Sequence, residues 1–203
     1  MDKKLQNHWQ SVYQNKDISK VSWAQKGKSL SFELILKYST INSKIIDCGS
    51  GASNLVDELL NSGYSDITLL DISNEALKMV EDRIGNKAQF IAKNILDFDV
   101  KNNNGFDIWH DRAVLHFLTK KSEIEKYFEI LKSSLGVGGM AIIASFATDK
   151  IRKCSDLNTQ PYDKDSMLKI IGDDFKMLEF LVENHQTPNG DSQLFNYFCL
   201  QKT

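Results

Sequence analysis

The sequence has few of the features that mark secreted, metal-binding or membrane proteins. Its 203 residues include three cysteines, at positions 48, 154 and 199, with no C-x-x-C pair and no Cys/His cluster. This spacing disfavours a disulfide framework and a structural zinc site, and it favours a reducing compartment. No stretch approaches the roughly 18 consecutive apolar residues of a membrane helix, and the first residues lack the apolar run of a signal peptide. We therefore expect a cytoplasmic protein without a metal centre or a membrane partner.

A strong charge of either sign is also missing. The 25 basic and 27 acidic residues give a formal net charge of −2, which does not indicate a nucleic-acid partner. The chain contains two prolines and no visible linker or internal repeat. Its length fits one domain with a sizeable core. We expect a single domain over residues 1–203, with an N-terminal segment at 1–28, a central core at 41–146, and a helix and hairpin at 147–203.

Short apolar runs alternate with helical patterns between residues 41 and 146. The five runs lie at 44–48, 67–70, 88–92, 106–110 and 140–146. Gly, Asn or Asp bounds them, as is typical of strands buried on both faces of a parallel sheet. The polar segment 149–162 is predicted as a loop, and two further strand-like runs, 175–182 and 193–200, flank a turn-rich link. The sequence thus predicts an α/β fold: a doubly wound, mostly parallel seven-stranded sheet with an antiparallel C-terminal hairpin.

Helix boundaries are indicated by capping residues. Ser73 and Asp163 each precede an apolar stripe at helical spacing and are expected to cap a helix. Ser122 followed by Glu125 has the pattern of a capping box. Gly136 stands where the end of that helix is expected.

The most informative segment is Ile45-Ile46-Asp47-Cys48-Gly49-Ser50-Gly51, in which a buried strand runs into a glycine turn and then a helix. Gly49 and Gly51 carry no side chains, so a ligand can approach the backbone at the carboxyl end of the strand. Asp71 ends the second strand at the spacing of a ribose-binding acid. An ionised Asp is acceptor-only and can receive two hydrogen bonds from a ribose diol. Together these residues predict a nucleoside-binding site.

Two residues discriminate between nucleoside cofactors. A dinucleotide fingerprint, G-x-G-x-x-G, requires glycine where this sequence has Asn54. Asp47 would repel a pyrophosphate, whereas it would attract the ammonium and sulfonium groups of S-adenosylmethionine. The charge pattern therefore favours S-adenosylmethionine.

These motifs resemble those of the class I, seven-strand S-adenosylmethionine-dependent methyltransferases, over nearly the whole chain. Segment 45–51 is similar to their hydrophobic-Asp-x-Gly-x-Gly motif, and 69–73 to the motif whose acid holds the ribose. Segment 131–140 is similar to the helix and glycine turn before their fifth strand. The resemblance implies a Rossmann-like methyltransferase fold with 41–146 as the cofactor-binding core. The cofactor contacts that it implies are Asp47, Gly49, Gly51, Asp71, Ile72, Asn94 and Ile95, with Asn94 standing where many members have Asp.

The N-terminal segment resembles the lid that precedes the core in this family. Trp9, Tyr13 and Trp23 correspond to its aromatic positions. The resemblance implies that residues 1–28 close over the cofactor and that Tyr13 and Trp23 contact its methionine moiety. Packing of Trp9 and Tyr13 on the core, four residues apart on one helix, is an alternative of equal weight.

The segment after the fourth strand resembles a motif at the acceptor site. Trp109-His110-Asp111-Arg112-Ala113-Val114 looks like the Asp-Arg-Ala-Val motif of bacterial methyltransferase-like proteins. More distantly, it is similar to the Asp-Lys-Gly-Thr segment of seven-strand protein lysine methyltransferases. We expect Asp111 and Arg112 to face the sulfonium as catalytic residues, with His110 beside them. The alternative is that Asp111 and Arg112 pair with each other and only fix the strand end.

Two other histidines carry weaker signals. His116 is flanked by apolar residues, so a hydrogen-bonded helix residue is a better interpretation than a catalytic base. His185 begins the turn-rich link before the last strand, where a plain turn is expected.

The sequence therefore predicts an S-adenosylmethionine-dependent methyltransferase that acts on a small-molecule acceptor, without nucleic acid. Methyl transfer is an in-line displacement that requires alignment and desolvation, so no catalytic triad need be present. A protein lysine methyltransferase, with a protein acceptor, is the alternative within this class. A nucleotide-dependent oxidoreductase and a non-catalytic nucleoside-binding protein are the alternatives outside it.

Overall fold

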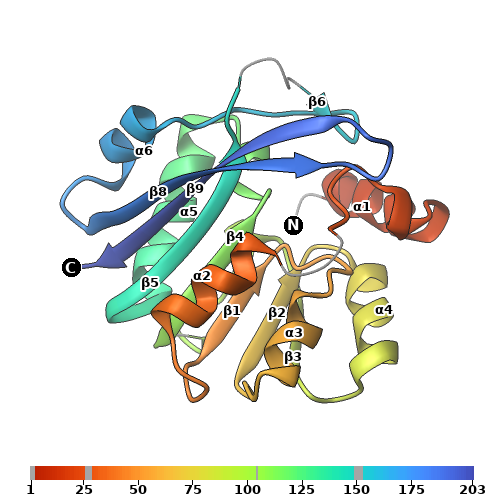
Figure 1. Ribbon diagram of the computed structural model, residues 1–203, viewed down its shortest axis with the longest axis horizontal. Coiled ribbons are helices and arrows are strands. Elements are labelled where there is room, and N and C mark those ends of the chain that lie inside the picture. Colours follow the sequence, from red (N-terminus) through yellow and green to blue (C-terminus); the bar gives the residue numbers. More distant parts are fainter. Residues whose placement is uncertain (1–2, 26–28, 104, 149–152) are drawn as a thin grey trace.

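The computed structural model describes residues 3–25, 29–103, 105–148 and 153–203. Its main feature is a seven-stranded sheet in the order β3-β2-β1-β4-β5-β9-β8 (Figure 1). The parallel strands are β1 (Ile45–Cys48), β2 (Ile67–Asp71), β3 (Gln89–Ala92), β4 (Phe106–Arg112) and β5 (Leu135–Phe146). The antiparallel hairpin is formed by β8 (Phe175–Gln186) and β9 (Ser192–Lys202). The predicted doubly wound sheet with its C-terminal hairpin is confirmed.

Helices cover both faces of the sheet. One face packs against α2 (Leu30–Tyr38), α3 (Leu55–Asn61) and α4 (Asn74–Ile84), and the other against α5 (Lys121–Ser134) and α6 (Lys164–Ile171). Helix α1 (Lys3–Asn15) lies beside α4, near the ends of the strands (Figure 1). The strand order reverses between β1 and β4, and ligands of such sheets bind at the carboxyl ends of the strands at this reversal.

Alternate residues of each strand enter two separate cores. In β4, Ile108 packs with α2 and α3, whereas Trp109 packs with α5. In β5, Ile142 and Ile143 divide in the same way. Because side chains of a strand alternate between faces and both faces are covered, the strands read as continuous apolar runs.

Several predicted boundaries are wrong around α5. The helix begins at Lys121 with Lys120 as its N-cap residue, so Ser122 lies inside the first turn and makes no capping box with Glu125. The helix ends at Ser134 and the chain becomes extended at Leu135. Gly136 therefore lies in β5 and does not end the helix. The predicted caps Ser73 and Asp163 are confirmed, the latter in a capping box with Ser166.

The segment predicted as a loop at 149–162 contains a short ribbon. Strands β6 (Lys153–Cys154) and β7 (Leu157–Asn158) pair antiparallel. Ser155 and Asp156 join them with φ of 46° and 64°, the left-handed conformation that tight two-residue hairpin turns require. Residues 149–152 of this loop, and residues 1–2 and 26–28 of the predicted lid, lie outside the described residues.

Within the described ranges, none of the helices has the length and apolarity needed to cross a bilayer. The same residues contain no group of three or more His, Cys, Asp or Glu side chains arranged to hold a metal ion.

Candidate functional site

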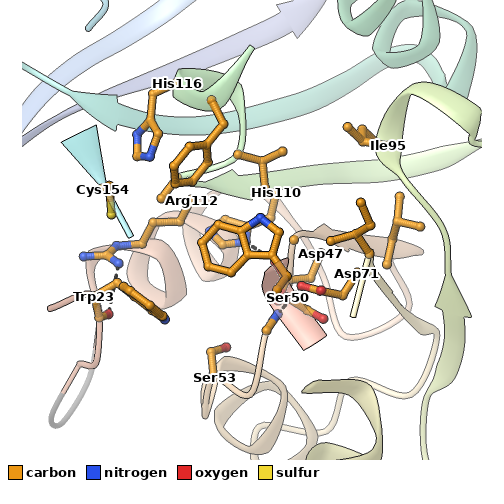
Figure 2. A pocket seen from close by; sticks show the side chains of 18 of the residues that line it. Trp23, Asp47, Ser50, Ser53, Asp71, Ile95, His110, Arg112, His116 and Cys154 are labelled. Carbon is orange, nitrogen blue, oxygen red and sulfur yellow. Dashed lines mark hydrogen bonds and ion pairs between the residues drawn. The ribbon is translucent and has the colours of Figure 1, made fainter. Parts of the chain in front are cut away.

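A cavity of about 940 Å³ opens at the carboxyl ends of β1, β2 and β4. Its volume is near the upper end of the range of small-molecule sites. The glycine loop, the end of β2 and the turn after β3 form one end of the cavity. Helix α1 and residues 18–25 also line it, and β6 and β9 contribute to the other end. Figure 2 shows Trp23 and Cys154 on the side of the cavity opposite Asp71 and Ile95.

Asp71 joins β2 to the glycine loop at the first end. Its Oδ1 accepts a hydrogen bond from the Ser73 amide at 2.7 Å, and its Oδ2 accepts one from the Gly51 amide at 2.8 Å. Burial raises the pKa of this carboxyl to about 6. Each carboxylate oxygen has a further lone pair, so Asp71 can still accept hydrogen bonds from a diol in the cavity.

The two glycines make room mainly for the protein's own side chains. Gly49 and Gly51 have φ of 64° and 55°, which disfavours any other residue. A Cβ on Gly51 would lie 2.4 Å from the Tyr13 hydroxyl, and a Cβ on Gly49 would lie 2.0 Å from Cγ2 of Val114. Both glycines also line the cavity, so the approach of a ligand to their backbone stays a prediction.

Tyr13 and Trp23 line the cavity, as the resemblance implied. Tyr13 is also buried in the core, and its contact with the methionine moiety stays a prediction. Burial and the nearby charge of Asp71 raise the pKa of its hydroxyl. Trp9 packs edge-to-face on Trp23, with ring centres 5.9 Å apart, and on Phe117 at 5.4 Å.

Gln10 ties helix α1 to the turn after β2. Its Oε1 accepts hydrogen bonds from the Ser73 hydroxyl at 2.7 Å and from the Glu75 amide at 3.0 Å. Ser73 also donates its backbone amide to Asp71. Helix α1 is thus held against the turn that positions Asp71.

The other predicted cofactor contacts also line the cavity, namely Ile72, Asn94 and Ile95. The Oδ1 of Asn94 accepts a hydrogen bond from the Leu96 amide at 2.9 Å and caps a short 3-10 helix, Ile95–Asp97. A contact between Asn94 and an adenine edge would therefore use its amide NH₂ group.

A chain of hydrogen bonds runs from Asp47 across the sheet. Oδ1 of Asp47 lies 2.6 Å from Nδ1 of His110, and Nε2 of His110 lies 2.8 Å from the Ser31 hydroxyl. The Ser31 hydroxyl lies 3.2 Å from that of Tyr197. Asp47 was predicted to attract the cofactor's positive groups, but it is buried and already paired with His110.

Arg112 continues this chain at the far end of the cavity. Its Nε donates to the Tyr197 hydroxyl at 3.2 Å, and one terminal nitrogen donates to the Trp23 carbonyl at 3.3 Å. The other terminal nitrogen lies 3.5 Å from a Glu183 carboxylate oxygen. The guanidinium also stacks 4.5 Å from the centre of the Phe195 ring. The charge of Arg112 is therefore compensated by Glu183 within the protein.

Asp111 points to the opposite face of β4, into the core beneath α5. Its carboxylate accepts hydrogen bonds from the Val114 amide at 2.8 Å, the Leu115 amide at 3.1 Å and the Tyr127 hydroxyl at 2.6 Å. Burial raises its pKa to about 6. Asp111 does not line the cavity and does not pair with Arg112, so both predicted placements are corrected. Successive residues of a strand point to opposite faces, which separates the two side chains.

The prediction for His116 also needs correction. The residue lies in a 3-10 helix, Leu115–Phe117, and its ring is parallel to that of Phe146 with centres 4.2 Å apart. Its side chain is fully buried and lines the cavity, yet neither ring nitrogen has a hydrogen-bond partner among the described residues. Burial and the nearby charge of Arg112 lower its pKa to about 3.

His185 differs from His116 in this respect. It lies at the end of β8 and donates from Nε2 to the Ser22 carbonyl at 2.8 Å. It does not line the cavity. Of His116 and His185, the hydrogen-bonded residue is thus His185.

The sequence reasoning missed four residues that the fold brings to the site, namely Ser31, Glu183, Phe195 and Tyr197. They come from α2, β8 and β9, far from the glycine loop in sequence. The only signal available was polar residues within apolar strand patterns.

The strand order, the nucleoside-type site at the reversal and the antiparallel C-terminal hairpin together define a class I methyltransferase fold. Residues 39–198 match the model of a family described as a methyltransferase domain, and the chain belongs to this family. The resemblance recognised in the sequence is thereby confirmed.

Individual relatives are more distant. The chain is 24% identical over 156 residues to a mouse eEF1A lysine and N-terminal methyltransferase, a match that covers 72% of this chain and 22% of that protein. It is 29% identical over 108 residues to a malonyl-[acyl-carrier protein] O-methyltransferase of Ilyobacter polytropus, covering 52% and 40%. The chain thus spans less than half the length of these relatives. A solved Burkholderia thailandensis 1,6-didemethyltoxoflavin-N1-methyltransferase has the same fold, with a TM-score of 0.74, 14% identity and coverage of 98% and 87%.

Proposed function

We propose that this protein transfers a methyl group from S-adenosylmethionine to a small molecule. The observation that carries the proposal is Asp71, whose carboxylate ends β2, is fixed by two backbone amides and lines the cavity at the strand reversal. A second observation fits a bound ligand. The Ser50 hydroxyl in the glycine loop is buried and lines the cavity, but it has no hydrogen-bond partner among the described residues.

Each group at this end has a role that its chemistry allows. Asp71 would accept hydrogen bonds from the two ribose hydroxyls. Ile72 and Ile95 would pack on the adenine, and the NH₂ group of Asn94 would donate to its edge. Tyr13 and Trp23 would cover the methionine moiety, where aromatic faces attract a cation. The cofactor supplies an electrophilic methyl group, and the protein aligns the acceptor and excludes water.

The cover over the cavity supports a small acceptor. Trp9, Tyr13 and Trp23 all line it, and Gln10 holds α1, the helix of Trp9 and Tyr13, against the core. The Burkholderia enzyme of this fold was solved with its small acceptor and S-adenosylhomocysteine. The mouse relative favours a second candidate, a lysine of a protein. Asp111 belongs to the segment that resembles the lysine enzymes, and its orientation into the core weakens that candidate.

The cytoplasmic location is part of the same proposal. Its support is that the three cysteines are free thiols, two of them buried. Thiols are kept in this state in a reducing compartment.

Binding of S-adenosylhomocysteine tests the cofactor site. We expect it to raise the melting temperature, because a ligand of the folded state stabilises it, and we expect NAD to have no effect. Asp71→Ala should weaken binding at least tenfold, since it removes roughly 1.5–3 kcal/mol of hydrogen bonds to a charged acceptor. Asp66→Ala, at the exposed start of β2, is the matched control. Unchanged affinity in folded Asp71→Ala protein would overturn the cofactor site.

Radiolabelled methyl transfer tests the acceptor class. The protein is incubated with labelled S-adenosylmethionine and either small-metabolite pools or protein lysates. We expect label in the metabolite fraction. Label in protein bands alone would replace the small-molecule acceptor by a protein acceptor.

A further inference from the structure

The end of the cavity away from Asp71 is built from aromatic rings. We call it the ring compartment, and it consists of Trp9, Trp23, His116, Phe117, Phe146 and Phe195. These rings contact one another edge-to-face, in parallel or, for Phe146 and Phe195, at a tilt of 46°, and they come from five separate parts of the chain. Flat, rigid walls of this kind suit a planar molecule, because aromatic pairs prefer stacked or edge-to-face arrangements.

His116 is the polar member of the compartment that lacks partners. Both of its ring nitrogens are buried without a hydrogen bond among the described residues. Buried polar atoms are almost always paired, because leaving one unpaired costs its full desolvation. A phenylalanine would stack on Phe146 without this cost. Figure 2 places the His116 ring on the cavity wall, on the same side as Arg112 and Cys154.

The charged groups beside the compartment are already paired. The charge of Arg112, whose field reaches His116, is compensated by Glu183, and its Nε and one terminal nitrogen donate to Tyr197 and the Trp23 carbonyl. Its Nη2, 3.5 Å from the Glu183 carboxylate, is buried without a hydrogen bond among the described residues. Asp111 points into the opposite core. His116 itself is neutral near pH 7, because its pKa is lowered to about 3. The compartment therefore offers a ligand one hydrogen-bond donor and one acceptor from the His116 imidazole. The charge of Arg112 beside it is compensated within the protein.

We propose that His116 determines acceptor specificity by hydrogen-bonding a polar N–H or O–H group of a planar, uncharged aromatic or heteroaromatic molecule bound in the ring compartment. This inference rests on the proposed methyl transfer. The hydrogen bond fixes the rotation of the acceptor between the rings and so aims its nucleophilic atom. An acceptor with a carboxylate or an ammonium group would lose hydration without gaining an unpaired opposite charge.

The first test is the stability of the free protein. His116→Phe removes two unpaired polar atoms and keeps the stack on Phe146, so we expect a melting temperature about 3 °C higher. His185→Phe is the matched control: it is equally buried but hydrogen-bonded to the Ser22 carbonyl, and its melting temperature should fall. A marked fall for His116→Phe would mean that its ring nitrogens are paired within the protein, against the inference.

The second test is calorimetric binding to protein saturated with S-adenosylhomocysteine at pH 8. The probes are 4-hydroxyquinoline, quinoline and quinoline-4-carboxylate, which share one ring system and differ in polar group and charge. We expect the wild type to bind 4-hydroxyquinoline at least tenfold more tightly than either of the others, since one paired hydrogen bond accounts for about this factor. His116→Phe should abolish the preference over quinoline, His116→Gln should keep part of it, and His185→Phe should keep all of it.

The outcomes separate this inference from the proposed function. Tightest binding of the carboxylate, a preference that survives in His116→Phe, or no binding of any probe to the loaded wild type would overturn the role of His116. Each of these leaves affinity for S-adenosylhomocysteine intact. Failure of the wild type to bind S-adenosylhomocysteine would instead overturn the proposed function, and this inference with it.

Discussion

The two faces of β4 carry similar kinds of side chains, but these side chains have different partners. On one side, His110 and Arg112 join a hydrogen-bond chain that lines the cavity and reaches α2, β8 and β9. On the other side, Trp109 and Asp111 meet Tyr127 of α5 in a closed core. The cavity side depends on partners far away in the sequence, whereas the core side depends on residues within 18 positions.

This difference indicates how polar groups in one strand acquire separate tasks. Asp111 holds the turn that begins at Ala113, a residue with φ of 79°, and thereby places Val114 and His116 at the cavity. It acts as a positioning residue. Arg112 and His110 face the cavity and hold protein partners, so they shape its wall, although Nη2 of Arg112 is buried without a hydrogen bond among the described residues.

The largest effect should follow from breaking the core side. Asp111→Ala leaves two backbone amides and the Tyr127 hydroxyl unpaired, which we expect to cost about 3–5 kcal/mol of unfolding free energy. Urea denaturation measures this loss. Asp111→Asn, which keeps an acceptor, should lose less. A folded Asp111→Ala protein of normal stability would show that the core side is dispensable.

A smaller effect should follow on the cavity side. Arg112→Met and Glu183→Gln each remove one partner of a partly buried ion pair, and each should cost about 1–3 kcal/mol. The double variant should lose less than the sum, with a coupling energy of about 1–2 kcal/mol. A thermodynamic cycle from chemical denaturation measures it. Strict additivity would mean that the pair does not interact.

Lowering the pH should distinguish the roles of two carboxyls that have the same raised pKa. Asp71 and Asp111 both titrate near pH 6, but Asp71 alone of the two faces the cavity. Protonation removes the acceptor for the ribose hydroxyls, so affinity for S-adenosylhomocysteine should fall about tenfold from pH 7 to pH 5. Asp71→Asn should flatten this dependence and Asp111→Asn should leave it.

Protonation of Asp71 and Asp111 should not unfold the protein, so unfolding through these two groups does not explain a loss of binding in acid. A carboxyl whose pKa is higher in the folded than in the unfolded state favours folding in acid, and this contribution is lost as the pH rises through about 6. The free energy of unfolding contributed by Asp71 and Asp111 should therefore be greater at pH 4 than at pH 7. Calorimetric melting of both Asn variants across this range checks the sign.

The smallest effect concerns the lid. Gln10→Ala removes the acceptor for the Ser73 hydroxyl and the Glu75 amide, and should cost about 1 kcal/mol. Hydrogen exchange in residues 3–15 should become faster, since α1 loses its tie to α4. Asn7→Ala, on an exposed position of the same helix, is the control. Equal exchange in the two variants would exclude Gln10 as the tie.

Sequence reasoning succeeds where the chemistry is local. The parallel strands and the C-terminal hairpin follow from apolar runs and their turn-rich boundaries, because each depends on neighbouring residues. Alternation along β4 also implies that Asp111 and Arg112 point to opposite faces, although it does not say which of them reaches the cavity.

The remaining errors arise from long-range pairing. Nothing near Arg112 indicates that Glu183 and Tyr197 compensate it, because the pairing of β9 with β5 and of β8 with β9 brings them there. The missing partners of His116 are likewise a property of its packed surroundings. The residues at Ser122 and Glu125 match a capping box, but the helix begins one residue earlier, at Lys121, so the box does not form.

The fit of Tyr13 against Gly51 and of Val114 against Gly49 has a consequence for how this sequence can change over evolution. A substitution at either glycine is blocked twice, by positive φ and by an occupant from a distant segment. Relief requires a smaller residue at position 13 or 114 first. In a library randomised at these four sites, we therefore expect the surviving variants to change in pairs, position 13 with 51 and position 49 with 114. A substitution in the glycine turn and a substitution of the side chain that packs against it should thus occur together.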